Sequence, residues 1–217
     1  MISHSKKFIF IHPHRTGGSS VELTLKKYSD DIISYRQKYG VSDLPFKHSN
    51  IPDLIKNNLI TEEEYKSFFK FAIVRNPWDR AISWYFWRLK INKDRYSKEL
   101  LQKNNNIPIF DRDTFIAYQY IEKGYKLPPL VEDLMDINGI FNINIYNDII
   151  KEENIEEDLS RICKKLDIPY RGLFPYTVPP YGGTNHKHYT EYYDEELINI
   201  VKEVYKEDIE SFGYKYE

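Results

Sequence analysis

Residues 8–20 read FIFIHPHRTGGSS and residues 71–85 read FAIVRNPWDRAISWY, and these two stretches decide the fold. Each begins with four apolar residues, which is typical of a short strand that is buried on both faces of a parallel sheet. Each then becomes polar and basic before helical spacing begins. The sequence therefore predicts two strand–loop–helix units, each with a loop suited to holding a phosphate group.

The first loop, residues 16–20, has the composition of an anion site. Its two glycines allow backbone conformations that let the chain approach a ligand closely. We expect Ser19 or Ser20 to cap the following helix, whose N–H groups and dipole favour negative charge. Arg15 adds a permanent cation. The loop is not a Walker A motif, because its glycines are adjacent and no lysine directly precedes the final hydroxyl residue. The alternative is an ordinary turn that contains glycines.

The second loop begins with Arg75, at the carboxyl end of its strand, where open α/β sheets bind ligands. A helix is expected from about residue 79 to residue 90. Ser83 lies one helical turn beyond Arg80 and is placed to share an anion with Arg75, whose planar fork suits phosphate. The alternative is that both arginines only pair with surface acids such as Asp79. We expect the neighbouring aromatic residues to be mostly core, namely Trp78, Trp84, Tyr85 and Trp87.

Together the loops resemble those of the PAPS-dependent sulfotransferases, particularly the carbohydrate-modifying, sulfotransferase family 2-like branch that includes heparan and chondroitin enzymes. PAPS is 3′-phosphoadenosine 5′-phosphosulfate, and PAP is the product that remains after sulfuryl transfer. The family pattern R-[ND]-P-x-x-R-x-x-S-x-[YF] is matched in full from Arg75 to Tyr85, and P-K-T-[GA]-[GT]-[TS]-S is matched from Thr16 to Ser20. Residues 149–159 are similar to its RFENLEEDL segment, and residues 188–214 to its closing helix and D-I-x-x-F-G-Y ending.

The resemblance implies an α/β fold: a single sulfotransferase domain over residues 1–217, with a mainly parallel central sheet flanked by helices. It implies PAPS as co-substrate without a metal, and a small-molecule or glycan acceptor, most readily a carbohydrate hydroxyl. Arg75 and Ser83 would hold the 3′-phosphate. Arg15 would stabilise the leaving oxygen, although relatives carry lysine there, and arginine differs in shape. The 5′-phosphosulfate would be cradled by Arg15, Thr16, Gly17, Gly18, Ser19 and Ser20.

His48 is the candidate catalytic base. Its stretch, Phe46-Lys47-His48-Ser49, resembles the Gly-His-Val-Ser of the uronyl 2-O-sulfotransferases, in which a histidine is the base. An imidazole has a pKa suited to proton transfer near neutrality. The alternative is a structural or surface histidine. His12 and His14 lie beside the first loop, where they could contact the phosphosulfate, and His186 and His188 are expected to contact PAPS or the acceptor at most.

Composition excludes some classes of protein. The 217 residues carry a formal net charge of −2, whereas a general nucleic-acid binder usually has a strong basic excess. Cys163 is the single cysteine, so no disulfide can form within the chain, and it is expected to be a core thiol. No signal peptide or transmembrane stretch is evident, which favours a cytoplasmic protein without a membrane anchor. Nothing in the sequence indicates an oligomeric state.

The remaining segments predict ordinary elements. Thr61 and Glu64 have the spacing of a capping box. Residues 155–166 and 192–212 have the periodicity of amphipathic helices. Residues 29–60 are expected to be irregular, residues 91–112 a surface loop, residues 113–123 a helix and residues 124–147 a segment that crosses the substrate cleft.

Two other functions stay open. A P-loop-type kinase or nucleotide phosphotransferase would use similar loops, although the Walker lysine and an evident acidic Mg²⁺ ligand are not found in the sequence. A catalytically impaired PAP- or PAPS-binding protein would keep the loops and lose turnover through the arginine at position 15. Dependence on ATP and Mg²⁺ would favour the first, and PAP binding without turnover the second.

Overall fold

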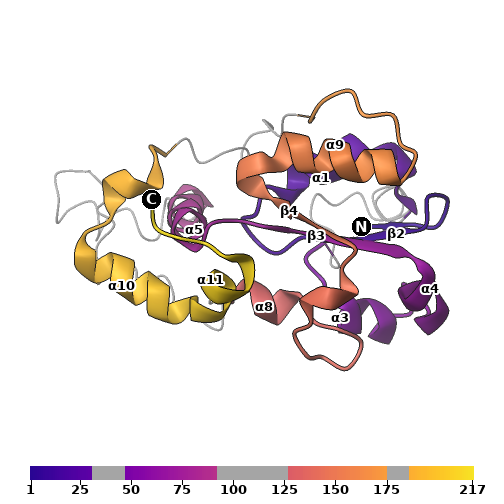
Figure 1. Cartoon of the computed structure of the whole chain (residues 1–217), viewed down its shortest axis with the longest axis horizontal. Helices are drawn as coiled ribbons and strands as arrows, with labels where there is room; N and C mark the ends of the chain where they lie inside the picture. Colours follow the sequence, from indigo (N-terminus) through magenta and orange to yellow (C-terminus); the bar gives the residue numbers. More distant parts are fainter. Residues whose placement is uncertain (31–46, 92–126, 175–185) are drawn as a thin grey trace. The chain divides into compact units, whose positions relative to one another are not determined.

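The computed structural model describes residues 1–30, 47–91, 127–174 and 186–217 (Figure 1). They form two compact units. The first comprises Met1–Arg75 and Leu130–Pro175, and the second comprises Asn76–Pro129 and Tyr176–Glu217. The two units are described separately below. A single domain over residues 1–217 stays a prediction.

The first unit is built on a four-stranded sheet in the order β1-β2-β3-β4. The strands are β1 (Ile2–Ser3), β2 (Phe8–Ile11), β3 (Phe69–Val74) and β4 (Asp148–Lys151). Only the pairing of β1 with β2 is antiparallel, so the predicted mainly parallel sheet is confirmed. In the parallel register Ile11 lies opposite Ala72, and Val74 lies opposite Lys151. The carboxyl ends of β2, β3 and β4 therefore meet at one edge.

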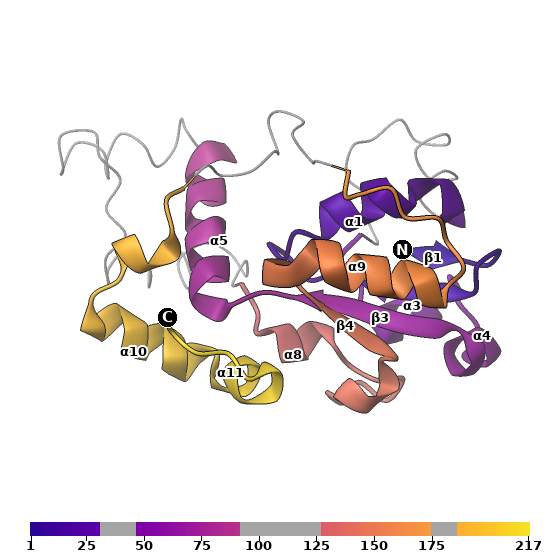
Figure 2. The same ribbon diagram turned by 45° about the horizontal axis from the view of Figure 1, so that its top comes forward.

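Helices cover both faces of this sheet, as the family resemblance implied. Figures 1 and 2 show α1 (Gly18–Leu25) and α9 (Ile155–Lys165) on one side and α3 (Ile51–Lys56) and α4 (Glu62–Ser67) on the other. The unit also contains the short helices α8 (Leu130–Asp133), η1 (Lys26–Tyr28), η2 (Ile143–Ile145) and η3 (Glu152–Asn154).

Alternate strand residues face opposite sides of the sheet, and this period builds the core. One set packs with the apolar residues of α1 and α9: Phe8, Phe10, Phe71, Ile73 and Ile150. Cys163 on α9 is fully buried in the same cluster, and burial raises the pKa of its thiol to about 11. The predicted core thiol is therefore confirmed, and a thiol that stays protonated is a poor nucleophile.

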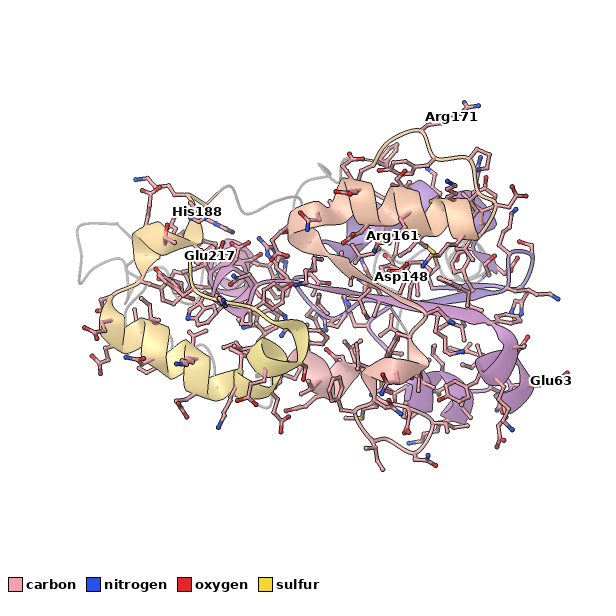
Figure 3. The ribbon with its side chains drawn as sticks, in the orientation of Figure 1. Glu63, Asp148, Arg161, Arg171, His188 and Glu217 are labelled. Atoms are coloured by element: carbon pink, nitrogen blue, oxygen red, sulfur yellow. The ribbon has the colours of Figure 1, made fainter. Side chains whose placement is uncertain are left out.

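Charged side chains fasten α9 to β4. Arg161 on α9 lies 2.8 Å from an oxygen of Asp148 on β4, as the labelled pair in Figure 3 shows, and Lys165 lies 2.7 Å from the other oxygen. Asp158 accepts a hydrogen bond from the backbone N–H of Lys151 (2.8 Å). These contacts position the turn that follows β4. The predicted strand-to-helix transition over residues 149–159 is confirmed.

Several local predictions are also decided. Thr61 and Glu64 form the predicted capping box. The prediction that residues 29–60 are irregular is wrong in its described part, because α3 forms where the Asn50 side chain accepts a hydrogen bond from the N–H of Asp53. The predicted loop at 91–112, apart from Ile91, and the predicted helix at 113–123 lie outside the described residues. Within the described ranges, no helix has the length and apolar character needed to cross a membrane.

The second unit contains α5 (Pro77–Ile91), η4 (Tyr189–Tyr192), α10 (Glu195–Val204) and α11 (Lys206–Phe212). The prediction of one helix over residues 192–212 is wrong, because the chain leaves helical geometry at Tyr205 (φ −112°, ψ 29°). The ring of Tyr205 is 1% exposed, and its hydroxyl donates to the carbonyl of Leu127 (3.1 Å). The apolar periodicity of residues 192–212 runs through this break and does not reveal it.

A buried ion pair joins the second arginine of the R-N-P-x-x-R stretch to the C-terminal D-I-x-x-F-G-Y segment. Arg80 on α5 is 1% exposed and Asp208 on α11 is fully buried, with 3.9 Å between Nη1 and Oδ2. The same Nη1 donates to the carbonyl of Pro128 (2.8 Å). Arg80 therefore pairs with a core acid rather than a surface acid. The predicted core positions of Trp78, Trp84 and Tyr85 are confirmed, since each is at most 5% exposed.

Candidate functional site

The candidate site lies at the edge where β2, β3 and β4 end. Arg75, the first residue after β3, reaches the loops that follow the other two strands. Its Nη1 donates to the carbonyl oxygen of Arg15 (3.3 Å), and its Nε lies 3.7 Å from Oε2 of Glu152. Two arginines predicted to bind PAPS are thus brought together, with a carboxylate beside them.

The first loop turns through left-handed backbone. Gly17 has φ 78° and is the N-cap of α1, which begins at Gly18. The prediction that Ser19 or Ser20 caps this helix is wrong, since no side chain caps it and a left-handed glycine makes the turn instead. Arg15 also lies in the left-handed region, with φ 66°. A residue other than glycine is strained there by about 1–2 kcal/mol, and such strain concentrates at functional sites.

Gly18 is required by a contact inside the protein. A Cβ atom at this position would lie 2.2 Å from Nδ1 and 2.5 Å from Cβ of His12, closer than real Cβ contacts allow. A Cβ on Gly17 would lie 3.0 Å from Cγ of Glu152. Both glycines were expected to allow the approach of a ligand, whereas protein neighbours already account for the small residue at Gly18.

The hydroxyl groups of the loop differ in their surroundings. Thr16 is 1% exposed, and its hydroxyl donates to the carbonyl of Pro13 (2.8 Å). This buried hydrogen bond stabilises the turn that leads into the loop. Ser19 is partly exposed, and its Oγ accepts a hydrogen bond from Nζ of Lys47 (3.0 Å). Ser20 is also partly exposed, and its backbone N–H donates to the carbonyl of Gly17 (3.1 Å).

Beneath the loop, His12 and Glu22 form a buried hydrogen-bonded pair, with 2.9 Å between Nε2 and Oε1. Burial lowers the pKa of His12 even though Glu22 opposes the shift. Burial alone would raise the pKa of Glu22, but the His12 imidazole and the Lys47 ammonium group outweigh it and lower the pKa to about 2. At neutral pH Glu22 is therefore a carboxylate that accepts from His12. This pairing leaves the His12 ring buried inside the protein, and its contact with the phosphosulfate stays a prediction.

His48, the predicted base, packs against the first loop. Its ring centroid lies 3.7 Å from that of His14 and 4.7 Å from that of His12. Its Nδ1 lies 3.0 Å from the carbonyl oxygen of His12. Because a carbonyl oxygen only accepts, Nδ1 carries the proton and the neutral ring keeps its lone pair on Nε2. Burial and the imidazoles of His12 and His14 lower the pKa of His48 to about 2, so the ring is neutral at pH 7.

The other candidate residues belong to the second unit. Ser83, on α5, is 1% exposed. His186 stacks on Phe86 with 5.8 Å between ring centroids, and His188 is exposed, with Nδ1 2.7 Å from the hydroxyl of Thr190. A 3′-phosphate site shared by Ser83 and Arg75 stays a prediction, as do contacts of these histidines with PAPS or an acceptor.

Three residues at the site were not found by sequence reasoning: Glu22, Lys47 and Glu152. Glu22 is a single acid in the first helix, and Lys47 is the sequence neighbour of His48; neither position carries a motif. Glu152 follows a strand end, which was a usable signal for the edge where ligands bind. The described residues contain no group of three or more side chains suited to a metal ion.

Comparisons with known proteins found a family model, a protein sequence and a solved structure that are similar to this chain. The model of a family described as "Sulfotransferase family" matches residues 1–215. A protein of Archaeoglobus fulgidus described as an uncharacterized protein is 24% identical over 120 residues, which are 55% of this chain and 84% of that protein. The crystal structure of mouse sulfotransferase SULT7A1 complexed with PAP is 11% identical, covers 96% of this chain and 86% of its own, and has a TM-score of 0.44.

Proposed function

The chain belongs to the sulfotransferase family, and we propose that it transfers a sulfuryl group from PAPS to a hydroxyl group of a carbohydrate, releasing PAP. One observation carries the proposal beyond family membership. Arg75 and His48 both contact the residues that lead into the first loop, Arg15 and His12 respectively, at the edge of the sheet where α/β proteins bind ligands.

The first loop would hold the 5′-phosphosulfate. The N–H groups at the start of α1 and the helix dipole favour an anion at this position. Arg15 would lie beside the oxygen that links phosphate to sulfur, while the loop from Thr16 to Ser20 would cradle the phosphate. Arg75 and Ser83 would hold the 3′-phosphate, as their match to the family pattern implies.

The reaction requires an acceptor oxygen to form a bond to sulfur while the bond between sulfur and the bridging oxygen breaks. Negative charge grows on the departing phosphate, where the guanidinium group of Arg15 would stabilise it. The acceptor hydroxyl loses a proton, for which Nε2 of neutral His48 is the proposed recipient. Bound PAPS brings negative charge near this ring, which raises the pKa of the imidazole and makes it a stronger base than in the unliganded protein.

The acceptor is proposed by chemical class. A carbohydrate hydroxyl follows from the resemblance to the carbohydrate-modifying branch, and a small-molecule or glycan acceptor is the broader form of the same proposal. A cytoplasmic location, no membrane anchor and no nucleic-acid partner stay predictions from composition.

The decisive experiment is calorimetric titration of the purified protein with PAP, with ATP plus Mg²⁺ as the parallel sample. The test variant is Arg75→Ala, and the matched control is Arg171→Ala, which removes the same charge from an exposed position of the first unit (Figure 3). We expect PAP to bind at about micromolar Kd. Arg75→Ala should weaken it at least about tenfold, because charge-assisted contacts contribute about 1.5–3 kcal/mol.

Each result separates the candidate functions. PAP binding that depends on Arg75 and not on Arg171 supports the PAPS site. A preference for ATP with Mg²⁺ would refute it in favour of a phosphotransferase. PAP binding without any turnover of PAPS, restored by Arg15→Lys, would identify an impaired relative.

A further inference from the structure

Lys47 brings a cation to the first loop from a separate part of the chain. Its Nζ lies 3.0 Å from Oγ of Ser19, on the first turn of α1, and 3.5 Å from Oε2 of Glu22. The Lys47 side chain is 20% exposed, whereas the Glu22 side chain is 9% exposed. The ammonium group is therefore held between a buried carboxylate and a partly exposed hydroxyl.

The direction of the hydrogen bond to Ser19 gives this arrangement a function. An ammonium group only donates, so Ser19 Oγ must be the acceptor and its own hydroxyl proton remains available to donate to another group. The helix N-terminus beside it already favours an anion. A hydroxyl that accepts from a cation and donates to an oxyanion is a charge-assisted contact, which is stronger than a neutral one.

We propose that Lys47 is a further binding residue for the sulfuryl donor, whose ammonium group, together with Ser19, holds the phosphosulfate in the first loop. This inference rests on the proposed function. It assigns to the loop a compact, strongly hydrated point charge, which the guanidinium group of Arg15 does not provide.

Glu22 is the one charged side chain among three groups that lie near the Lys47 ammonium group, namely Glu22, His12 and His48. Glu22 is ionised, because His12 and Lys47 lower its pKa to about 2 against the effect of burial. His12 and His48 both have lowered pKa values and are neutral at pH 7. Glu22 thus keeps the ammonium group in place before the ligand arrives and offsets part of its charge, while Arg15 supplies a second cation for the ligand's oxygens.

A purely structural role for Lys47, as the partner of Glu22, predicts a different outcome. In that case the Lys47→Met variant would be less stable than the unmodified protein, but the folded variant would bind PAP with unchanged affinity. Binding and stability must therefore be measured separately. Lys66→Met is the matched control, since Lys66 is an exposed lysine of the same unit whose partner is Glu62 (3.7 Å).

The experiment is calorimetric titration of each variant with PAP, alongside thermal unfolding without ligand. Lys47→Met should weaken PAP binding about tenfold, from loss of one charge-assisted contact. Lys66→Met should stay within about twofold of the unmodified protein, because screened surface charges act weakly. Lys47→Arg should keep only part of the affinity, because the charge remains while the shape of the cation changes. Affinity of Lys47→Met within that same twofold range would overturn the inference.

A second measurement needs no variant and so does not depend on folding of the Lys47→Met protein. Lysine acetylation rates are followed by mass spectrometry with and without saturating PAP. PAP should slow the labelling of Lys47 and leave that of Lys66 unchanged. Equal labelling of Lys47 in both samples would overturn the inference.

The two proposals fail in distinguishable ways. If the unmodified protein does not bind PAP, the proposed function itself is refuted. If the unmodified protein binds PAP and Lys47 neither affects binding nor is protected, only the role of Lys47 is refuted.

Discussion

Replacing Asp208 by asparagine tests the buried ion pair that joins α11 to α5. The substitution conserves volume and removes one charge, so the guanidinium group of Arg80 stays buried without its carboxylate. Both side chains are at most 1% exposed. Removing one partner of a buried pair costs about 3–5 kcal/mol, because an uncompensated charge is left in a region of low dielectric.

The same helix supplies the control. Lys206 and Glu210 pair across one turn of α11 at 4.0 Å, with side chains 65% and 66% exposed. An exposed pair of this kind contributes about 0.3–0.5 kcal/mol. Glu210→Gln should therefore have almost no effect, whereas Asp208→Asn should remove a large share of a total stability of about 5–15 kcal/mol.

Urea unfolding followed by circular dichroism gives the free energy of unfolding for both variants. Asp208→Asn should lower the unfolding temperature by roughly 10 °C, from about 2–4 °C for each kcal/mol in a chain of this size. The double variant Arg80→Met with Asp208→Leu should recover much of the loss, since apolar side chains often replace a buried pair without cost. If Asp208→Asn cost less than about 1 kcal/mol, or no more than Glu210→Gln, the pair would behave as a solvated one and the reasoning would be wrong.

Three further predictions concern the first unit. Gly18→Ala should displace the ring of His12 and abolish PAP binding, which calorimetry would detect, and near-normal binding would show that the loop has room for a Cβ atom. Acid should destabilise the protein below about pH 6.5. The pKa of His48 is about 2 in the folded state and 6.5 in the unfolded state, so only the unfolded state takes up a proton at His48 in this range. The free energy of unfolding should therefore fall by about 1 kcal/mol per pH unit. Glu22, whose pKa falls from 4.5 to about 2, adds a similar loss below about pH 4.5. Urea midpoints that stay constant from pH 7.5 to pH 5, or that change equally in His48→Gln, would contradict this account. Cys163 should react with a thiol reagent only on unfolding, and rapid labelling of the native protein would place it outside the core.

The sequence by itself determined β2 and β3, the loops that follow them and the family. Four consecutive apolar residues form a strand that can be buried on both faces, and glycine permits the left-handed turn at Gly17, so each signal is local. The capping box at Thr61 and the amphipathic period of α9 are local in the same way. Signals of this kind can be read from the chain because the interacting groups are within a few residues of one another.

Only the tertiary structure decided which side chains meet. Lys47 reaches Ser19, and Asp208 reaches Arg80, across long stretches of chain whose spacing carries no signal. The reason for Gly18 is its contact with the ring of His12, and the break at Tyr205 lies inside a stretch whose apolar period continues through it. Such contacts depend on how the elements pack, because the energy of a buried charge or a steric overlap is set by its three-dimensional neighbours and not by its neighbours in sequence.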